Sequence, residues 1–383
     1  MTGATEMDPT LETASVERMP VERIPVERIP VAVLGATGAV GQAFVRLLAG
    51  HPWFALTEVA ASERSAGRPY GEAVRWVGGD IPLAAARLPV TLCDPASVHA
   101  PIVFSALDAS VALETEQAFA RDGRLVVTNA RNHRMEEDVP LVIPEVNADH
   151  LALLALQRER RHWKGGIVAN ANCAAIVIAM ALAPLHRAFG LQRVFVTTMQ
   201  AVSGAGYPGV PALDILGNVI PYIGGGEEEK IELETVKMLG AFDGDLFRVA
   251  PFGVSAQVNR VPVEHGHTAC IAAGFERTPT AVEAVEALRA WTPATAGLDL
   301  PSAPASPIVV LDEDDRPPQP RRDADRGRGM TVTIGRVRPD PLLDLRLVAC
   351  GHNIIRGAAG AALLNAELLV ARGLVTAEGV VGA

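Results

Sequence analysis

The chain has 383 residues, a formal net charge of -10 at pH 7 and an aromatic content of 4%. This length allows two domains with a buried core, and the acidic balance argues against nucleic acid or an anionic membrane as the main partner. Four cysteines lie far apart, without a C-x-x-C pair and without a signal peptide. We therefore expect reduced thiols and a cytoplasmic protein.

The first thirty residues are polar and contain three related pentads, 16–20, 21–25 and 26–30, each ending in proline. Proline at every fifth position prevents a continuous helix, so residues 1–30 are predicted to form a flexible or extended arm.

Residues 31–169 alternate between short apolar runs and helical patterns. A buried strand at 31–34 leads into a glycine-rich turn at 35–41 and a helix at 42–49. Further strands are expected at 56–61, 101–106, 125–128 and 167–169, with a helix at 111–121. This alternation predicts a Rossmann-like, doubly wound parallel α/β sheet.

After Cys173 the pattern changes to longer strands and amphipathic helices, which predicts a second α+β domain with a mixed sheet. Its strands are expected at 194–199, 257–263, 268–274 and 330–336, and its helices at 174–182, 228–239 and 280–290. The Pro-, Asp- and Arg-rich segment 301–329, with its acidic run 312–315, is predicted to be a solvated or subunit-contacting loop. A helix at 361–371 should pack back on the first domain. The predicted boundaries are 31–169 completed by 351–383 for the first domain, and 170–350 for the second.

The glycine-rich turn predicts a dinucleotide site, because a strand, a G-x-x-G-x-x-G turn and a helix point backbone N–H groups at a pyrophosphate. A tight structural turn is the alternative. The candidate cofactor-binding residues are Gly35, Thr37, Gly38, Ala39, Val40 and Gly41. After the second strand, where an NAD enzyme usually has a lone acidic residue, Ser62 and Arg64 could pair with a 2′-phosphate and favour NADP, while Glu63 between them leaves NAD open.

Cys173 stands out among the cysteines because it lies between a strand and a helical run. A helix N-terminus can lower the pKa of a thiol, so this position favours a nucleophilic thiolate. Cys93, Cys270 and Cys350 lie in or beside apolar strands, where we expect small buried hydrophobes.

Three segments around this cysteine, 170–173, 199–207 and 259–267, resemble the active-site segments of aspartate-semialdehyde dehydrogenases, with the archaeal and fungal branch looking closest. Segments 132–135, 144–147, 227–230 and 356–360, together with Asn353, are similar as well. The matching segments follow the order found in the family and span nearly everything from Val31 onward.

The resemblance implies an NADPH-dependent enzyme that reduces L-aspartyl-4-phosphate to L-aspartate 4-semialdehyde and phosphate through a cysteine thioester, in the biosynthesis of lysine, threonine and methionine. It implies a homodimer or homotetramer, and small-molecule substrates as the other partners. The implied catalytic residues are Cys173 as nucleophile, His267 as general acid/base and Gln200 as the group that orients the substrate. Arg134 and Lys230 would hold phosphate, Arg260 the carboxylate and Glu227 the ammonium of the substrate, while Ser203, Gly204 and Asn353 would contact the cofactor.

Some positions depart from the family pattern. Ala171, Ala174 and Ala175 stand where proline and hydroxyl residues are common, and His265 stands where an acidic residue is frequent. A metal held by His265 and His267 would lack a third ligand nearby, so no metal is expected.

Three other functions remain as alternatives. An archaeal-type malonyl-CoA reductase shares the scaffold and the cysteine chemistry and would differ only in substrate recognition. Glyceraldehyde-3-phosphate and N-acetyl-glutamyl-phosphate dehydrogenases share the two-domain plan but have different segments around the cysteine and histidine. A catalytically inactive NADP-binding regulator is disfavoured by the presence of Cys173, Gln200, Arg260 and His267 together.

Overall fold

The computed structural model describes residues 27–244 and 246–381. The predicted N-terminal arm therefore lies outside the described residues, apart from its last four. Of those, Ile29 and Pro30 already belong to the first strand, which begins two residues earlier than expected. Within the described part of the chain, no helix is long and apolar enough to cross a bilayer.

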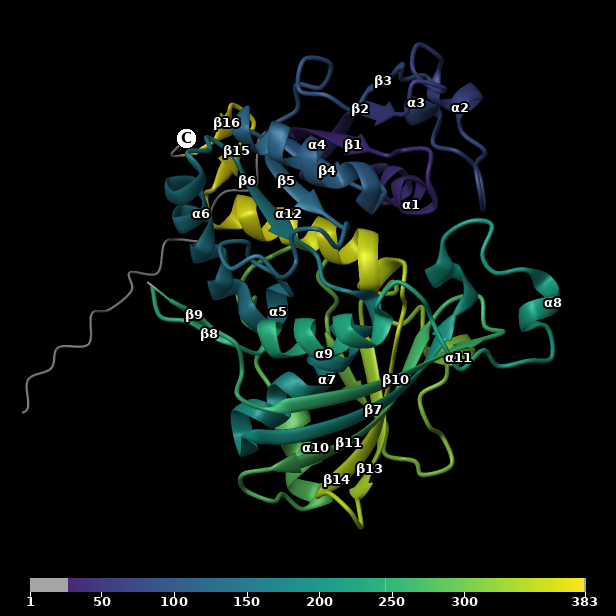
Figure 1. The fold of residues 1–383 in the computed structure, drawn as a ribbon, viewed down its shortest axis with the longest axis vertical. Coiled ribbons are helices and arrows are strands. Elements are labelled where there is room, and N and C mark those ends of the chain that lie inside the picture. Colours follow the sequence, from purple (N-terminus) through teal and green to yellow (C-terminus); the bar gives the residue numbers. More distant parts are fainter. Residues whose placement is uncertain (1–26, 245, 382–383) are drawn as a thin grey trace, which may run out of the picture.

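The first sheet has six parallel strands in the order β3-β2-β1-β4-β5-β6, and it is the Rossmann-like sheet that the sequence predicts (Figure 1). The strands are β1 Ile29–Leu34, β2 Phe54–Ala61, β3 Val90–Leu92, β4 Ile102–Ser105, β5 Leu125–Thr128 and β6 Gly166–Ala169. Strands β4, β5 and β6 are buried at every residue, as expected for parallel strands covered on both faces. Helices α1 Ala39–Leu48, α4 Ala109–Arg121 and α12 Gly360–Ala371 pack against this sheet.

The strand order of this sheet reverses at β1, since β2 lies on one side of it and β4 on the other. In doubly wound sheets a ligand crevice opens at the carboxyl ends of the strands where the order reverses. The glycine-rich turn follows β1 at this point, so the fold directs it at the crevice.

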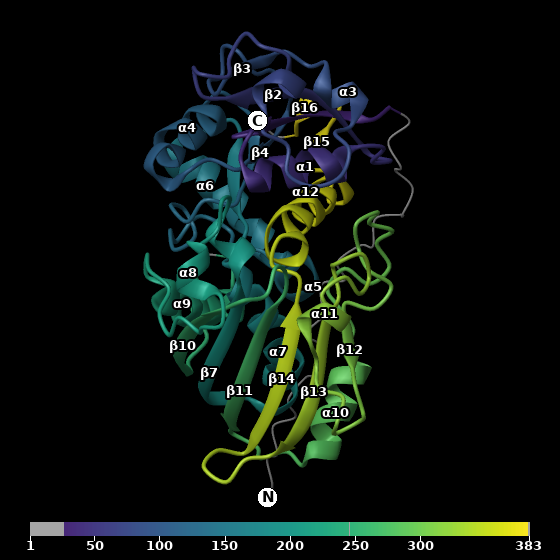
Figure 2. The same ribbon diagram turned by 90° about the vertical axis from the view of Figure 1, so that its right-hand side faces the viewer.

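The second sheet is mixed, as predicted, with the order β10-β7-β11-β14-β13-β12. Its strands are β7 Leu191–Ala201, β10 Gly253–Val261, β11 His267–Phe275, β12 Ile308–Val310, β13 Val332–Pro339 and β14 Leu345–Gly351. Figure 2 shows most of them side by side in the lower half of the molecule. Strands β7 and β10 run parallel, and β11 runs antiparallel to both β7 and β14. The helices α7 Cys173–Phe189, α9 Glu227–Met238 and α10 Ala281–Ala290 pack against this sheet.

The expectation that Cys270 is a buried hydrophobe is wrong. Along β11, Ala269, Ile271 and Ala273 are buried, whereas Cys270 between them points to the opposite face and is exposed. Cys350 is buried as expected, and Cys93 is half-buried.

Segment 301–329 is not entirely a loop. It contains the edge strand β12 and the helical turn α11 Pro320–Asp323, whose Asp323 is fully buried and paired with Arg316 and Arg326. The acidic run 312–315 is exposed. The Pro and Arg content of the segment correctly indicated that it lies at the surface. It gave no sign of the strand of three residues.

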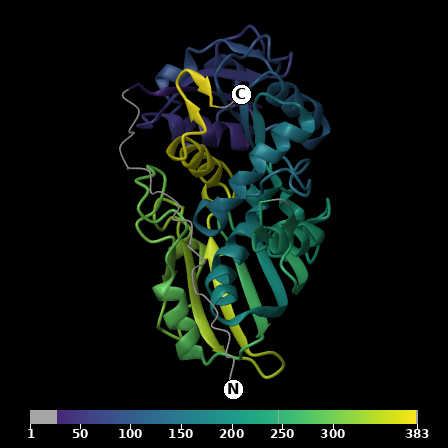
Figure 3. The same ribbon diagram turned by 90° about the vertical axis from the view of Figure 1, so that its left-hand side faces the viewer.

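The chain returns to the first sheet through the π-helical turn η3 Ile355–Ala359 and α12, which lies between the two sheets (Figure 3). Arg356 in η3 is fully buried and forms a two-pronged ion pair with Glu145, at 2.6 and 2.8 Å.

The shorter elements are α2 Tyr70–Ala73, α3 Leu83–Ala86, α5 Pro144–Asn147, η1 Ala148–Ala152, α6 Leu153–Arg161, η2 Val202–Ala205, α8 Ala212–Ile215, β8 Ala241–Phe242, β9 Phe247–Arg248, β15 Val375–Thr376 and β16 Gly379–Val380.

Candidate active site

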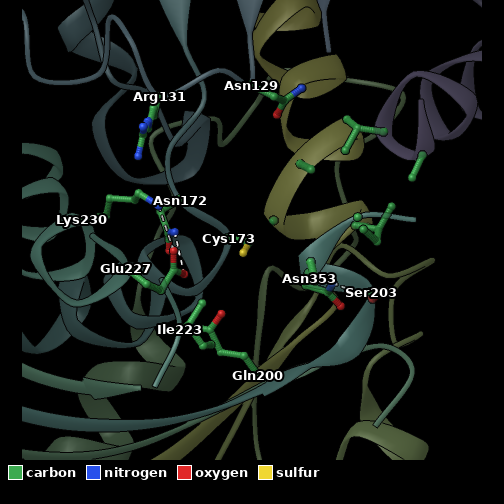
Figure 4. A pocket seen from close by; sticks show the side chains of 18 of the residues that line it. Asn129, Arg131, Asn172, Cys173, Gln200, Ser203, Ile223, Glu227, Lys230 and Asn353 are labelled. Atoms are coloured by element: carbon green, nitrogen blue, oxygen red, sulfur yellow. Dashed lines mark hydrogen bonds and ion pairs between the residues drawn. The ribbon is translucent and has the colours of Figure 1, made fainter. Parts of the chain in front are cut away.

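A cavity of about 720 Å³ lies where the carboxyl ends of the first sheet meet η3, β7 and the start of α9. It brings together eleven of the residues predicted from the sequence: Ala39, Val40, Arg134, Cys173, Gln200, Ser203, Gly204, Glu227, Lys230, Arg260 and Asn353. Figure 4 shows Cys173 in the middle, with Asn172, Glu227 and Lys230 on one side and Ser203 and Asn353 on the other.

The position of Cys173 follows from the way α7 begins. Asn172 is the N-cap of this helix, and its side-chain oxygen accepts hydrogen bonds from the backbone N–H groups of Ala174 and Ala175, at 2.9 and 3.0 Å. Cys173 is the first helical residue, so its side chain projects from the helix N-terminus into the cavity.

His267, the first residue of β11, is almost completely buried and lies next to the cysteine. Its Nε2 lies 3.2 Å from the Sγ of Cys173, and its Nδ1 accepts a hydrogen bond from the N–H of Ala201 at 3.1 Å. Because Nδ1 is an acceptor, the proton of the neutral ring resides on Nε2 and faces the sulfur.

The electrostatics of this pair differ from the prediction. Burial, followed by the charge of Glu227, raises the pKa of the Cys173 thiol to about 12, although Arg134, Arg260 and the N–H of Ala174 act in the opposite direction. The helix N-terminus does lower the pKa, as expected, but burial has the larger effect. Burial therefore opposes the thiolate that the helix N-terminus favours.

The imidazole is also uncharged. Burial first, and then the charges of Arg260 and His352, lower the pKa of His267 to about 3. At neutral pH the structure therefore contains a neutral thiol beside a neutral imidazole.

Two residues in the first turn of α9 line the opposite wall. Glu227 is buried, accepts a hydrogen bond from the side-chain amide of Asn172 at 2.9 Å, and pairs with Lys230 at 3.1 Å. Glu227 is therefore not the solvated helix-start residue that its acidic neighbours could suggest.

Arg134 and Arg260 supply buried positive charge on two sides of the cysteine. One guanidinium nitrogen of Arg134 donates to the carbonyl of Asn129 at 2.7 Å, and the other pairs with Glu234 at 3.0 Å. Arg260 donates to the carbonyl of Ala201 at 2.8 Å, and burial lowers its pKa. Since arginine remains charged even when buried, both groups can hold anions in this cavity.

Gln200 also lies on the cavity wall and is almost completely buried. Its side-chain amide donates to the hydroxyl of Thr198 at 3.3 Å, which leaves its oxygen available to a ligand.

Residues with a Cβ would be strained or would clash at two positions of the glycine-rich turn. Gly35 has a φ of +69°, and a Cβ there would lie 2.6 Å from the carbonyl oxygen of Ala106. A Cβ at Gly41 would lie 2.2 Å from the carbonyl oxygen of Gly35. The N-cap of α1 is Gly38, which has no side chain to satisfy the first N–H groups of the helix.

Among the predicted cofactor residues, Ala39 and Val40 line the cavity, whereas Ser62 and Arg64 are exposed beyond the carboxyl end of β2 and outside it. Asn353 donates to the hydroxyl of Ser203 at 2.8 Å, and His265 contacts the same hydroxyl at 2.9 Å. His265 therefore points toward Ser203, whereas His267 points toward the thiol.

Several lining or supporting residues were not predicted. Asn129 follows β5, and the rule that strand carboxyl ends line the crevice could have identified it. Arg131 adds a cation to the wall and donates to the carbonyl of Gly225 at 2.9 Å. Gly357 lies in segment 356–360, which resembles the family, but no role was assigned to it from the sequence. Glu234 is important only through its three-dimensional contacts, which no local pattern reveals.

Comparison with known proteins agrees with this geometry. Residues 30–154 match the family model "Semialdehyde dehydrogenase, NAD binding domain", and residues 182–356 match "Semialdehyde dehydrogenase, dimerisation domain". The aspartate-semialdehyde dehydrogenase of Archaeoglobus fulgidus is 50% identical over 339 residues, covering 88% of this chain and 97% of that protein. The chain belongs to the aspartate-semialdehyde dehydrogenase family.

Fungal aspartate-semialdehyde dehydrogenases are similar too, as the resemblance to both branches led us to expect. The Cryptococcus neoformans protein is 46% identical over 356 residues, covering 90% of this chain and 97% of that protein. The crystal structure of aspartate semialdehyde dehydrogenase with NADP from Candida albicans is 41% identical, covers 91% of this chain and 99% of that one, and has a TM-score of 0.83. These relatives do not favour the malonyl-CoA reductase alternative.

Proposed function

We propose that this chain is an aspartate-semialdehyde dehydrogenase, which reduces L-aspartyl-4-phosphate with NADPH to L-aspartate 4-semialdehyde and phosphate. The observation that carries the proposal is the contact of 3.2 Å between His267 and Cys173, which lines a cavity whose walls also bear Arg134, Lys230 and Arg260. A nucleophile, a proton carrier and three cations are the groups that an acyl phosphate with a carboxylate requires.

The residues at the other end of the cavity fit a dinucleotide. The start of α1 offers backbone N–H groups without a side-chain cap, and the side-chain nitrogen of Asn129 is buried without a hydrogen-bond partner among the described residues. We propose that the glycine-rich turn holds the pyrophosphate, that Ser203, Gly204 and Asn353 lie beside the nicotinamide, and that Arg64 favours NADP through its 2′-phosphate.

The chemistry begins with the sulfur. Attack of Sγ on the acyl carbon forms the thioester bond and breaks the bond to the phosphate oxygen, and the thiol proton leaves with the phosphate as hydrogen phosphate. Arg134 and Lys230 neutralise the charge of this leaving group. Because the thiol pKa is high, we expect thiol deprotonation to accompany attack rather than precede it.

The second half-reaction needs a hydride, which NADPH supplies to the thioester carbon when bound. The Nε2–H of His267 then donates a hydrogen bond to the oxygen as negative charge develops there. Collapse of the hemithioacetal anion releases the aldehyde and leaves the sulfur as a thiolate, which takes up a proton from solvent to restore the thiol. Gln200 orients the acyl group for both steps.

Substrate choice rests on the groups that flank the cysteine. Arg260 would hold the α-carboxylate and Glu227 the ammonium, which malonyl-CoA lacks. Since Glu227 is paired with Lys230 and Asn172, an incoming ammonium would share this carboxylate. Malonyl-CoA offers no ammonium to pair with this carboxylate.

The proposal includes a homodimer or homotetramer, supported by the match of 182–356 to a dimerisation domain, and a cytoplasmic location. Residues 31–169 and 351–383 would bind the cofactor, and 170–350 would provide catalysis and dimerisation.

Purified protein incubated with aspartate semialdehyde, phosphate and NADP tests the proposal through the absorbance of NADPH. We expect NADPH formation that requires all three reactants. An enzyme that is inactive on these reactants but reduces malonyl-CoA would overturn it.

A further inference from the structure

Glu234 lies behind the cavity wall and does not line it, yet it occupies the same face of α9 as two residues that do. Glu227, Lys230, Glu234 and Lys237 are spaced three and four residues apart, so they follow one side of the helix. The Glu234 side chain is only 2% exposed, and a buried carboxylate requires partners.

The two oxygens of this carboxylate join two separate segments of the site. Oε1 accepts from a guanidinium nitrogen of Arg134 at 3.0 Å, and Oε2 accepts from the backbone N–H of Asn172 at 2.5 Å. Asn172 directly precedes Cys173. A single rigid group therefore links the guanidinium to the N-cap residue of α7. Among the described residues, the only other hydrogen bond of that guanidinium is the one it donates to the carbonyl of Asn129.

The backbone of the loop that carries Arg134 is held by a different residue. The Lys237 ammonium donates to the carbonyls of Arg134, Glu136 and Val139, at 2.7, 2.7 and 3.0 Å. Because Lys237 already fixes the course of this loop, the contacts with the Glu234 carboxylate and the Asn129 carbonyl are left to determine where the guanidinium head points, and Glu234 is the charged partner of the two.

We propose that Glu234 is a positioning residue, which sets the Arg134 guanidinium at a fixed place relative to Cys173 and so determines how well the site binds phosphate. This inference rests on the proposed function. If Glu234 only stabilised the fold, its loss would weaken the binding of all substrates alike. Because it acts through Arg134, its loss should weaken the binding of phosphate more than that of the other substrates.

The test is steady-state kinetics of Glu234→Gln in the direction that consumes phosphate. An amide has one acceptor oxygen and turns an NH₂ group toward the second donor, so one of the two contacts is lost. We expect KM for phosphate to rise about tenfold or more, while KM for aspartate semialdehyde and NADP changes less than about twofold. Glu234→Asp keeps the charge but is too short to reach both partners, and it should raise KM for phosphate as well.

Glu232→Gln is the matched control. Glu232 lies on the same helix and also accepts a backbone N–H, that of Ala256 on β10 at 3.0 Å, but it does not contact Arg134. This variant should keep the wild-type KM for phosphate. In an Arg134→Gln background, Glu234→Gln should cause no further rise, because the residue through which it acts is gone.

An unchanged KM for phosphate in Glu234→Gln and Glu234→Asp would overturn the inference, as would an equal rise in all three KM values. A further rise in the Arg134→Gln background would overturn it too. Failure of the proposed function is seen separately, because wild-type protein would then show no phosphate-dependent formation of NADPH before any variant is compared.

Discussion

Gly357 offers a sharp test of the site because it packs directly against the nucleophile. A Cβ added at Gly357 would lie 2.5 Å from the Cβ and 2.9 Å from the Cα of Cys173. Carbon atoms in contact normally lie ~3.5–4.0 Å apart, so Gly357→Ala must move one of the two segments by about 1 Å. Gly357 does not have a positive φ, so the substitution tests space and not backbone strain.

The expected cost has two parts. Overpacking a buried contact destabilises a protein by about 1–3 kcal/mol. A displacement of about 1 Å at a reacting group can lower kcat by about a hundredfold. We therefore expect Gly357→Ala to fold, with a modestly lower melting temperature and a far lower kcat at saturating substrates.

The control is Gly253→Ala on β10, where an added Cβ meets nothing within 4 Å and φ is not positive. It should keep the wild-type kcat and melting temperature. If Gly357→Ala also retains the wild-type kcat, the close packing of η3 against the nucleophile does not govern its position, and the reasoning fails.

Three further predictions follow from the site and its supports. Burial raises the thiol pKa of Cys173 to about 12, so the rate at which iodoacetamide alkylates Cys173 in a Cys270→Ser background should rise about tenfold per pH unit between pH 7 and 9. A rate that reaches a plateau below pH 8 would show a stabilised thiolate instead. Arg64→Ala should weaken binding of NADP far more than binding of NAD in fluorescence titrations, and equal losses would mean that Arg64 does not contact the 2′-phosphate. Glu145→Gln leaves the fully buried Arg356 without its charged partner and should lower the free energy of unfolding by about 3–5 kcal/mol in denaturant titrations, whereas a loss below about 1 kcal/mol would contradict the assigned pairing.

Much of the fold could be predicted because the chain has strong local periodicity. Short apolar runs separated by amphipathic helices indicated the parallel sheet, and the strand expected at 125–128 coincides with β5. Boundaries were less certain. Helix α1 begins at Ala39, three residues before the expected start, because its first turn is formed by residues of the glycine-rich segment itself. Strand β12 was missed because three residues carry too little periodicity to be recognised.

The exposed side chain of Cys270 shows a second limit. Alternation along a strand predicts that neighbours face opposite sides, but it does not tell which side the helices cover. An apolar strand such as β11 looks buried on both faces in the sequence, and only the positions of α7 and α10 show which face is left open.

The residues of the candidate site were predictable where their chemistry and the family resemblance agree. Properties that depend on burial in the folded chain were less predictable. Cys173 and His267 were expected to cooperate although they lie 94 residues apart, and they do lie in contact. The charge state of the pair was not predictable, since the pKa of a thiol depends on how far the folded chain excludes water. Glu234 was missed for a similar reason, because its two partners come from distant segments.

A covalent thioester on Cys173 can be detected by mass spectrometry of the intact protein and its peptides. Wild-type protein is mixed with aspartate semialdehyde and NADP without phosphate, so that the acyl-enzyme forms but cannot be cleaved by phosphate. We predict one aspartyl adduct on the Cys173 peptide, its disappearance when phosphate is added, and no adduct in Cys173→Ala despite intact NADPH binding. Formation of NADPH without an adduct on Cys173, or with an adduct on another residue, would contradict it.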